Sequence, residues 1–216
     1  MRHIAPRPAR LLAAAVLATL TGATQAEVSI ALADAGFESA YSSFAYRGQD
    51  GHVTFTYEPT GANVGWAYAS GTGVASSYDA LSAYEGNSFA FVQNATEKFG
   101  QLIEVASTSQ VSTSFALALR PGYNSGQVVG IMVDGQQVAA VAATSTQWTL
   151  QQVSLGTLSA GTHTFGFRGL NPNHAGDTTA FIDAVKLSAS PVPEASSLSL
   201  ALAGAGLVVA WRRRRT

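Results

Sequence analysis

Residues 129–140 read VGIMVDGQQVAA, two short segments on either side of the pair Asp134-Gly135. In these segments apolar side chains alternate with small or polar ones, which is the period of a β-strand. An Asp-Gly pair accommodates the positive φ angles of a type I′ turn, the tight connection that suits two twisted antiparallel strands. The stretch therefore predicts a β-hairpin.

Similar alternation recurs through residues 27–190, between clusters of Gly, Asn and Ser. In segments 115–119 and 164–168 it places the large apolar side chains on one face of a strand. No segment of this region shows a helical period over three turns. Many short strands without helices predict one all-β domain, an antiparallel β-sandwich of two sheets. Further strands are predicted at 53–57, 88–93, 101–104, 148–154 and 180–187.

The N-terminal end of the chain departs from this pattern. Three arginines precede the apolar run 11–20, and small residues follow up to Ala26. This order is typical of a secretory signal peptide, which inserts as a helix and is removed during export. Residues 1–26 are therefore predicted to be a signal helix that signal peptidase cleaves after Ala26.

The C-terminal end carries a second apolar run, residues 196–211, which has no charged side chain. Its length approaches that needed to cross a bilayer core of roughly 30 Å as a helix. The positive-inside rule keeps a basic cluster in the cytoplasm and so places residues 27–190 outside. The sequence thus predicts a transmembrane helix in the inner membrane, followed by a cluster made of Arg212, Arg213, Arg214 and Arg215.

The tail 191–216 resembles the PEP-CTERM sorting signal of bacterial surface and exopolysaccharide-associated proteins. The resemblance rests on the motif Val192-Pro193-Glu194-Ala195, the apolar helix and the four arginines, with Ala195 where the family more often has a second proline. It implies cleavage by an exosortase-type protease. The protein is then exported, transiently anchored in the inner membrane, and found at the cell surface or outside the cell after processing.

The charge of the domain excludes some partners. Residues 27–190 hold five lysines and arginines against twelve aspartates and glutamates, a net charge of −7. Five scattered cations on an anionic domain offer no surface for nucleic acid or another acidic polymer. Neutral polysaccharide and metal cations remain as candidate partners. The chain has no cysteine, so disulfides and thiolate metal sites are excluded.

An ordered set of short segments resembles the galactose-binding-domain-like jelly rolls found in carbohydrate-binding modules. The resemblance covers roughly residues 33–187 and rests on Gly36-Phe37-Glu38, 65–68, 71–75, 85–93, 133–135, Trp148, 160–165 and 181–185. It implies a jelly-roll β-sandwich that binds carbohydrate.

The same resemblance implies a structural calcium ion held by Glu38 and Asp183, since hard cations prefer carboxylate and carbonyl oxygens. Ala184 stands where the family commonly has a second Asp, which removes one potential ligand. The alternative is that both carboxylates are solvated or hydrogen-bonded at strand ends. No other cofactor is expected.

Sugar recognition needs aromatic faces and polar side chains gathered in loops. The candidates for such contacts are Tyr78, Tyr84, Tyr123, Asn171 and His174. Trp66 and Trp148 are expected in the core instead, because large apolar rings usually fill a sandwich.

No catalytic motif stands out. The chain has neither a His-Glu-x-x-His nor a Gly-x-Ser-x-Gly pattern, and His163 is expected at an inward or rim position with a hydrogen-bonded ring. The chain is therefore predicted not to be an enzyme. Two functions remain: an exported protein that binds carbohydrate of the extracellular matrix, or a structural surface or biofilm-matrix protein without a specific sugar ligand.

Overall fold

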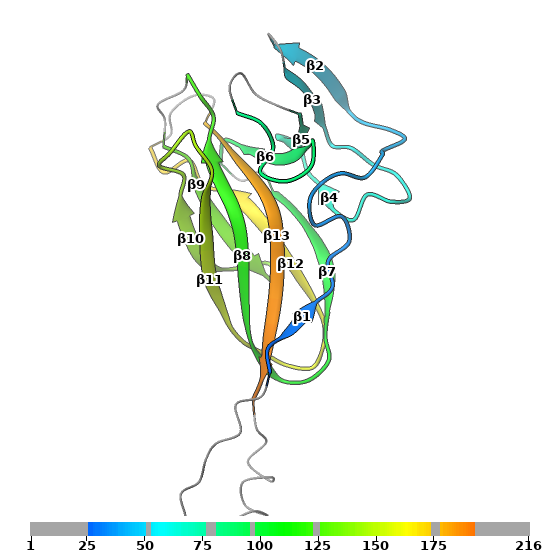
Figure 1. Cartoon of the computed structure of the whole chain (residues 1–216), viewed down its shortest axis with the longest axis vertical. Helices are drawn as coiled ribbons and strands as arrows, with labels where there is room; N and C mark the ends of the chain where they lie inside the picture. Colours follow the sequence, from blue (N-terminus) through cyan, green and yellow to red (C-terminus); the bar gives the residue numbers. More distant parts are fainter. Residues whose placement is uncertain are drawn as a thin grey trace, which may run out of the picture.

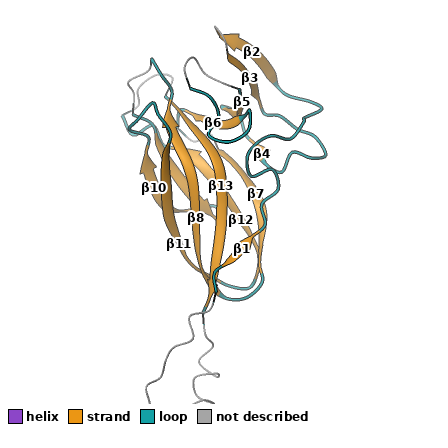
Figure 2. Cartoon of the chain, viewed as in Figure 1, coloured by secondary structure: helices purple, strands orange, loops and turns teal. Residues whose placement is uncertain are grey.

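The computed structural model of the protein describes residues 26–50, 53–76, 81–95, 98–122, 126–173 and 178–192. Every regular element among them is a β-strand, and the paired strands run antiparallel (Figure 2). The strands form two sheets that pack face to face. The predicted two-sheet antiparallel sandwich is thus confirmed.

The larger sheet has eight strands in the order β11-β8-β13-β6-β5-β3-β2, with β1 paired to β13 (Figure 1). Its strands are β1 (Val28–Ile30), β2 (Tyr46–Asp50), β3 (Val53–Tyr57), β5 (Thr72–Ala75), β6 (Phe89–Gln93), β8 (Ser109–Leu119), β11 (Thr149–Leu158) and β13 (Thr179–Pro191). The smaller sheet has the order β10-β9-β12-β7-β4. Its strands are β4 (Ala67–Tyr68), β7 (Lys98–Val105), β9 (Val128–Val133), β10 (Gln136–Ala142) and β12 (Gly161–Gly169).

The hairpin expected from residues 129–140 is present. Strands β9 and β10 pair directly, and the two turn residues have φ angles of 50° at Asp134 and 75° at Gly135. Positive φ at both central positions is the mark of a type I′ turn. A bulge between Gln137 and Ala139 interrupts the register further along β10.

The main core lies between the sheets and is rich in aromatic rings. Phe115 of β8 meets Phe167 of β12 with ring centroids 5.1 Å apart, which joins the two sheets. Trp66 is 3% exposed and packs edge-on against Phe99 of β7, as expected for a core tryptophan. Each such buried ring contributes roughly 1.5–3 kcal/mol to stability, and this core must act without disulfides.

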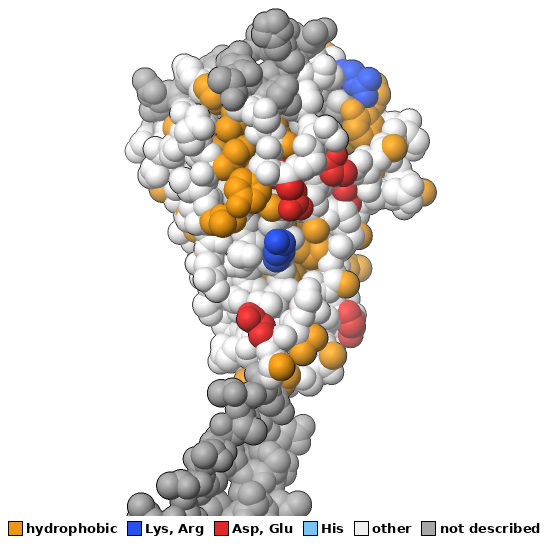
Figure 3. Space-filling model, viewed as in Figure 1, with side chains coloured by type: hydrophobic (Ala, Val, Ile, Leu, Met, Phe, Trp, Pro, Cys, Tyr) orange, Lys and Arg blue, Asp and Glu red, His pale blue; other side chains and the backbone are white. Residues whose placement is uncertain are grey.

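A second apolar cluster covers part of the outer face of the larger sheet. Phe89, Phe91 and Phe181 point to this side, where residues 81–83 and the half-buried Trp148 pack on them. The expected core position of Trp148 is therefore only half realised, at the edge of this smaller cluster. Figure 3 shows that charged side chains are few and separate on the face of the molecule that it presents.

The described chain begins and ends at the same pole of the sandwich (Figure 1). Val28 of β1 pairs with Ala189 of β13, which is the last strand. The predicted signal helix and the predicted transmembrane helix at 196–211 lie outside the described residues. Among the residues that are described, no helix has the length and apolar character to cross a membrane.

Candidate functional site

Two carboxylates hold one loop over the outer face of the larger sheet. Asp183 Oδ2 accepts hydrogen bonds from the backbone amides of residues 84 and 85, at 2.8 and 3.1 Å. Glu38 Oε1 accepts those of residues 87 and 88, at 2.8 and 2.7 Å. Glu38 and Asp183 lie 145 positions apart in the chain, yet they anchor the same short segment. The sequence resemblance had assigned this pair to calcium.

Asp183 lies at a bulge in β13 and is fully buried. Its Oδ1 atom accepts the amide of Ala184 at 2.7 Å, and Ala184 has a φ of 51°, which turns the strand locally. Burial raises the pKa of Asp183 to about 6, although the three amide hydrogen bonds oppose the shift by favouring the charged form. The carboxylate is thus a solvent-excluded hub for backbone amides.

This donor set does not favour a calcium ion between Glu38 and Asp183. The carboxylate oxygens that face the loop accept N–H groups, whose positive ends would repel a cation. Within the described ranges, no three His, Asp or Glu side chains gather around a point that could hold a metal. Of the two alternatives at the sequence level, hydrogen-bonded carboxylates describe this geometry better, and calcium binding stays a prediction.

The residues predicted to contact sugar are not brought together by the described chain. Tyr84 is 44% exposed and meets the ring of Trp148 edge-on at 6.3 Å, over the larger sheet. Asn171 follows β12 of the smaller sheet, is buried, and donates its backbone amide to Gln127 Oε1 at 2.8 Å. Its surroundings are those of a structural residue. Tyr78, Tyr123 and His174 lie outside the described residues.

His163 occupies the rim position expected for it, with both ring nitrogens engaged. Nδ1 lies 2.7 Å from Asp134 Oδ2, and Nε2 lies 3.0 Å from the Ser159 carbonyl oxygen and 3.5 Å from its hydroxyl. The Asp134 hydrogen bond raises the pKa of His163 above its ordinary value. A Ser-His-Asp order appears here, but Nε2 faces a carbonyl acceptor and so favours the protonated ring over a general base.

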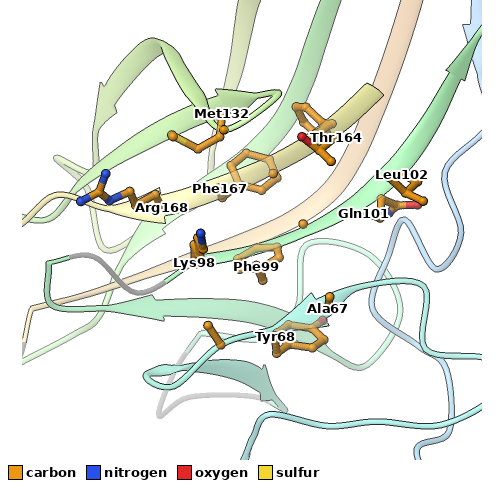
Figure 4. Close-up of a pocket in the computed structure, with 15 residues that line it drawn as sticks. Ala67, Tyr68, Lys98, Phe99, Gln101, Leu102, Met132, Thr164, Phe167 and Arg168 are labelled. Atoms are coloured by element: carbon orange, nitrogen blue, oxygen red, sulfur yellow. The ribbon is translucent and has the colours of Figure 1, made fainter. Parts of the chain in front are cut away.

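A hollow of about 740 Å³ lies on the outer face of the smaller sheet (Figure 4). Its floor is made by Gly100 of β7 and Gly166 of β12, which stand opposite each other in the register. A Cβ atom on Gly100 would lie 2.7 Å from the Phe165 carbonyl oxygen, and one on Gly166 would meet that of Phe99. The strands approach so closely that only glycine fits, and the missing side chains create the space.

The walls of the hollow combine apolar and polar groups. Leu102 and Thr164 form one side, and Met132 of β9 forms another. The half-buried Tyr68 of β4 stacks on Phe99, with ring centroids 5.4 Å apart and planes inclined by 26°. Gln101 belongs to the wall but uses its amide on the backbone of Ala33, at 3.0 and 3.1 Å. The hollow therefore offers apolar surface with a small number of polar groups, as ligand pockets do.

Two cations stand side by side at one end of the hollow. Lys98 of β7 and Arg168 of β12 are directly paired in the register and line the same space (Figure 4). In the described part of the chain, no carboxylate forms an ion pair with either side chain. Like charges placed directly opposite on neighbouring strands destabilise a sheet. No ion pair among the described residues offsets this repulsion.

Two buried polar atoms in the described residues have no hydrogen-bond partner, and both belong to residues of the hollow. They are the Tyr68 hydroxyl and Arg168 Nε. Burial raises the pKa of Tyr68 well above its ordinary value. Buried polar groups are nearly always hydrogen-bonded, so two such atoms in one region point to a binding role or to strain.

Sequence reasoning missed this hollow, although one signal was present. Gly166 interrupts the predicted alternating strand 164–168, and Gly100 directly precedes the predicted strand 101–104; a glycine inside a strand is typical of a bulge or of close approach by another group. Their pairing across 66 residues depends on the order of strands in the sheet, which periodicity does not reveal. Lys98 and Arg168 had been counted among scattered cations for the same reason.

Several solved structures are similar to this one to different degrees. A cyclase from Fischerella sp. TAU aligns with a TM-score of 0.54 at 15% identity, over 78% of this chain and 100% of its own. A xylan-binding domain from Paenibacillus barcinonensis aligns at 0.44 and 16% identity, over 63% and 92%. A family 35 carbohydrate-binding module from Clostridium thermocellum aligns at 0.43 and 15%, over 56% and 90%. At these identities the likeness concerns the fold alone.

Comparison by sequence gives a different kind of result. No protein of curated function matches the chain. A family model described as the PEP-CTERM protein-sorting motif matches residues 191–215, the segment in which the sequence predicted that signal. Such a motif implies an exported protein that is transiently anchored in the membrane and then processed by an exosortase-type protease. We conclude that this chain carries a PEP-CTERM sorting signal on the C-terminal side of a two-sheet antiparallel β-sandwich.

Proposed function

We propose that the protein is an exported, surface-sorted and non-catalytic carbohydrate-binding protein, and that the hollow on its smaller sheet receives carbohydrate of the extracellular matrix. The observation that carries the proposal is the glycine floor, which leaves a space of about 740 Å³ lined by apolar side chains and by Lys98 and Arg168. That volume falls within the range of roughly 300–1,000 Å³ typical of ligand sites.

The chemistry of the walls suits a sugar better than a wholly apolar ligand. Pyranose rings present C–H groups to apolar and aromatic surface and hydroxyl groups to hydrogen-bonding side chains. Leu102 and Met132 supply the first kind of contact, while Thr164, Lys98 and Arg168 supply the second. Sorting by the C-terminal signal brings the domain to the compartment in which matrix polysaccharide occurs.

The absence of cysteine from the sequence allows a direct test. Leu102 lines the hollow and is 68% exposed, whereas Leu150 of β11 is 65% exposed on the other sheet. The variants Leu102→Cys and Leu150→Cys, each modified with a bulky maleimide, form a matched pair. Modification at position 102 should abolish saturable binding of matrix polysaccharide by the full chain in mild detergent, measured by calorimetry. Modification at position 150 should leave it unchanged.

Two outcomes would overturn the proposal. If the maleimide at position 102 leaves polysaccharide binding intact, the sugar site lies elsewhere, and the loop around the exposed Tyr84 becomes the next candidate. If no matrix polysaccharide gives saturable heat, the structural role in the surface or biofilm matrix is favoured instead. The same titration with calcium and with EDTA tests the predicted ion at Glu38 and Asp183, since a bound ion would make the unfolding temperature depend on calcium.

A further inference from the structure

We infer that the sugar bound in the hollow carries a carboxylate, which Lys98 and Arg168 receive together. This inference rests on the proposed function and specifies its ligand as a uronate-type unit. It differs from the expectation of a neutral polysaccharide that followed from the net charge of the domain. Two of the five domain cations, Lys98 and Arg168, lie opposite each other on neighbouring strands, which the net charge alone does not reveal.

Lys98 and Arg168 lie directly opposite each other on β7 and β12. On antiparallel strands, directly opposed residues have Cβ atoms roughly 4.5–5.5 Å apart, close enough for like charges to repel. Lys98 and Arg168 are opposed in this way, and both lie on the outer face of their strands. A carboxylate between them would turn the repulsion into two attractions, and none of the carboxylates among the described residues pairs with either cation.

The second step concerns the guanidinium of Arg168. Its Nε atom is buried without an acceptor among the described residues, whereas its terminal nitrogens are not among the buried unpaired atoms and are the donors that an anion can reach. Arginine presents its N–H groups as a planar fork that matches the two oxygens of a carboxylate. Lysine adds a compact charge without that directional demand. The pair thus combines geometric and electrostatic selection for one planar anion.

The third step concerns the size of the anion. Strand β12 places Gly166 two positions before Arg168, and β7 places Gly100 two positions after Lys98, so the open floor adjoins the two cations on the same face. A sugar ring can occupy the floor while its carboxylate reaches the cations. A domain charge of −7 opposes a long polyanion, which leaves recognition to one acidic unit within an oligosaccharide.

The test uses the full chain in mild detergent and two probes. One probe is an oligosaccharide that contains glucuronic acid, and the other is the same oligosaccharide after reduction of its carboxyl groups to alcohols. At low ionic strength the acidic probe should bind at least about tenfold more tightly, the ratio that a difference of 1.4 kcal/mol gives. The ratio should shrink at high salt, because screening weakens an exposed charge pair.

Variants locate the effect. Lys98→Gln and Arg168→Gln should each weaken binding of the acidic probe more than binding of the neutral probe, because only the acidic probe loses a charge pair. Lys186→Gln is the matched control, since Lys186 is an exposed cation on β13 of the other sheet. Equal binding of both probes to the unmodified chain would overturn the inference but leave sugar binding in the hollow intact. Binding of neither probe would overturn both.

Discussion

The hydrogen bond between His163 and Asp134 links the beginning of β12 to the turn between β9 and β10. Asp134 belongs to the β9–β10 turn and also accepts the amide of Thr164 at 2.9 Å, while His163 reaches back to the Ser159 carbonyl. The bond lowers the pKa of Asp134 and raises that of His163. The pair therefore stabilises the fold only over a limited range of pH.

The sign of that dependence follows from the two shifts. The contribution of His163 is complete below its unfolded pKa of about 6.5 and is lost as pH rises through its higher folded value. The variant Asp134→Asn keeps a residue that tolerates positive φ but removes the charge. Urea unfolding at pH 5.5 should show a loss of up to about 1 kcal/mol, since Asp134 is half-exposed, and a smaller loss at pH 8.5. An equal loss at both pH values would contradict this assignment.

Asp183, unlike the half-exposed Asp134, is a buried carboxylate, and its contacts are hydrogen bonds from backbone amides. Replacement by Ala leaves the amides of residues 84, 85 and 184 without their acceptor, so Asp183→Ala should cost roughly 2–4 kcal/mol. The loss should be visible in urea unfolding. Faster hydrogen exchange confined to residues 84–88 would show that the anchored loop is released. Retained protection there would mean that other contacts hold the loop.

The folded pKa of Asp183, about 6, lies above the unfolded value of 3.8. The folded state therefore binds the proton more tightly, and the stability from this group is complete below pH 3.8 and is lost as pH rises through about 6. Stability of the unmodified chain should consequently rise as pH falls from 7.5 to 5. Asp183→Ala should flatten that rise, and an unchanged slope would show that another group is responsible.

At the scale of strands and turns, glycine acts in two distinct ways. Gly135 has a φ of 75° and open space around the position of a Cβ atom, so Gly135→Ala should cost only backbone strain, roughly 1–2 kcal/mol. Gly166→Ala should cost more, because its Cβ meets the backbone of β7 and would push two paired strands apart. Urea midpoints of the two variants provide the comparison. A smaller loss for Gly166→Ala would show that the strands separate easily.

Sequence periodicity predicted the long strands well, because each carries its own alternation. Segments 115–119 and 164–168 lie inside β8 and β12, and 53–57 coincides with β3. The shorter strands β1, β2, β4 and β5 were not predicted. They have two to five residues and depend on their neighbours in the sheet. The five-residue β3, VTFTY, alternates apolar and polar side chains, whereas the equally long β2, YRGQD, does not.

The candidate site was harder to predict, because its parts come together only through the order of strands. The resemblance to carbohydrate-binding jelly rolls implied that Glu38 and Asp183 share one calcium ion; in the structure the two carboxylates hold the same loop. What they bind there, backbone amides, depends on loop geometry that residue types do not encode. Tyr84 and Asn171 were predicted to contact the same sugar because of their side-chain chemistry and their place in loops. In the structure Tyr84 lies over the larger sheet, whereas Asn171 follows β12 of the smaller sheet.

At the scale of the whole molecule, the sorting signal predicts a change in the covalent chain. Material recovered from the cell surface should begin at Glu27 and lack the arginines of the tail, if signal peptidase and an exosortase-type protease both act. Mass spectrometry of the termini provides the measurement. Replacement of Glu194 in the motif should leave the tail attached. An intact C-terminus through Thr216 in surface material would contradict processing.

The paired first and last strands have a mechanical consequence. Any pull on the C-terminal end is carried along β13, which is bonded to β8 over most of its length and to β1 beside the exit point. Antiparallel hydrogen bonds lie across the strand direction, so such a pull loads them together in shear instead of opening them one by one. A ligand held on β7 and β12 would transmit tension through the aromatic core to β13, and the domain would resist stretching between the two.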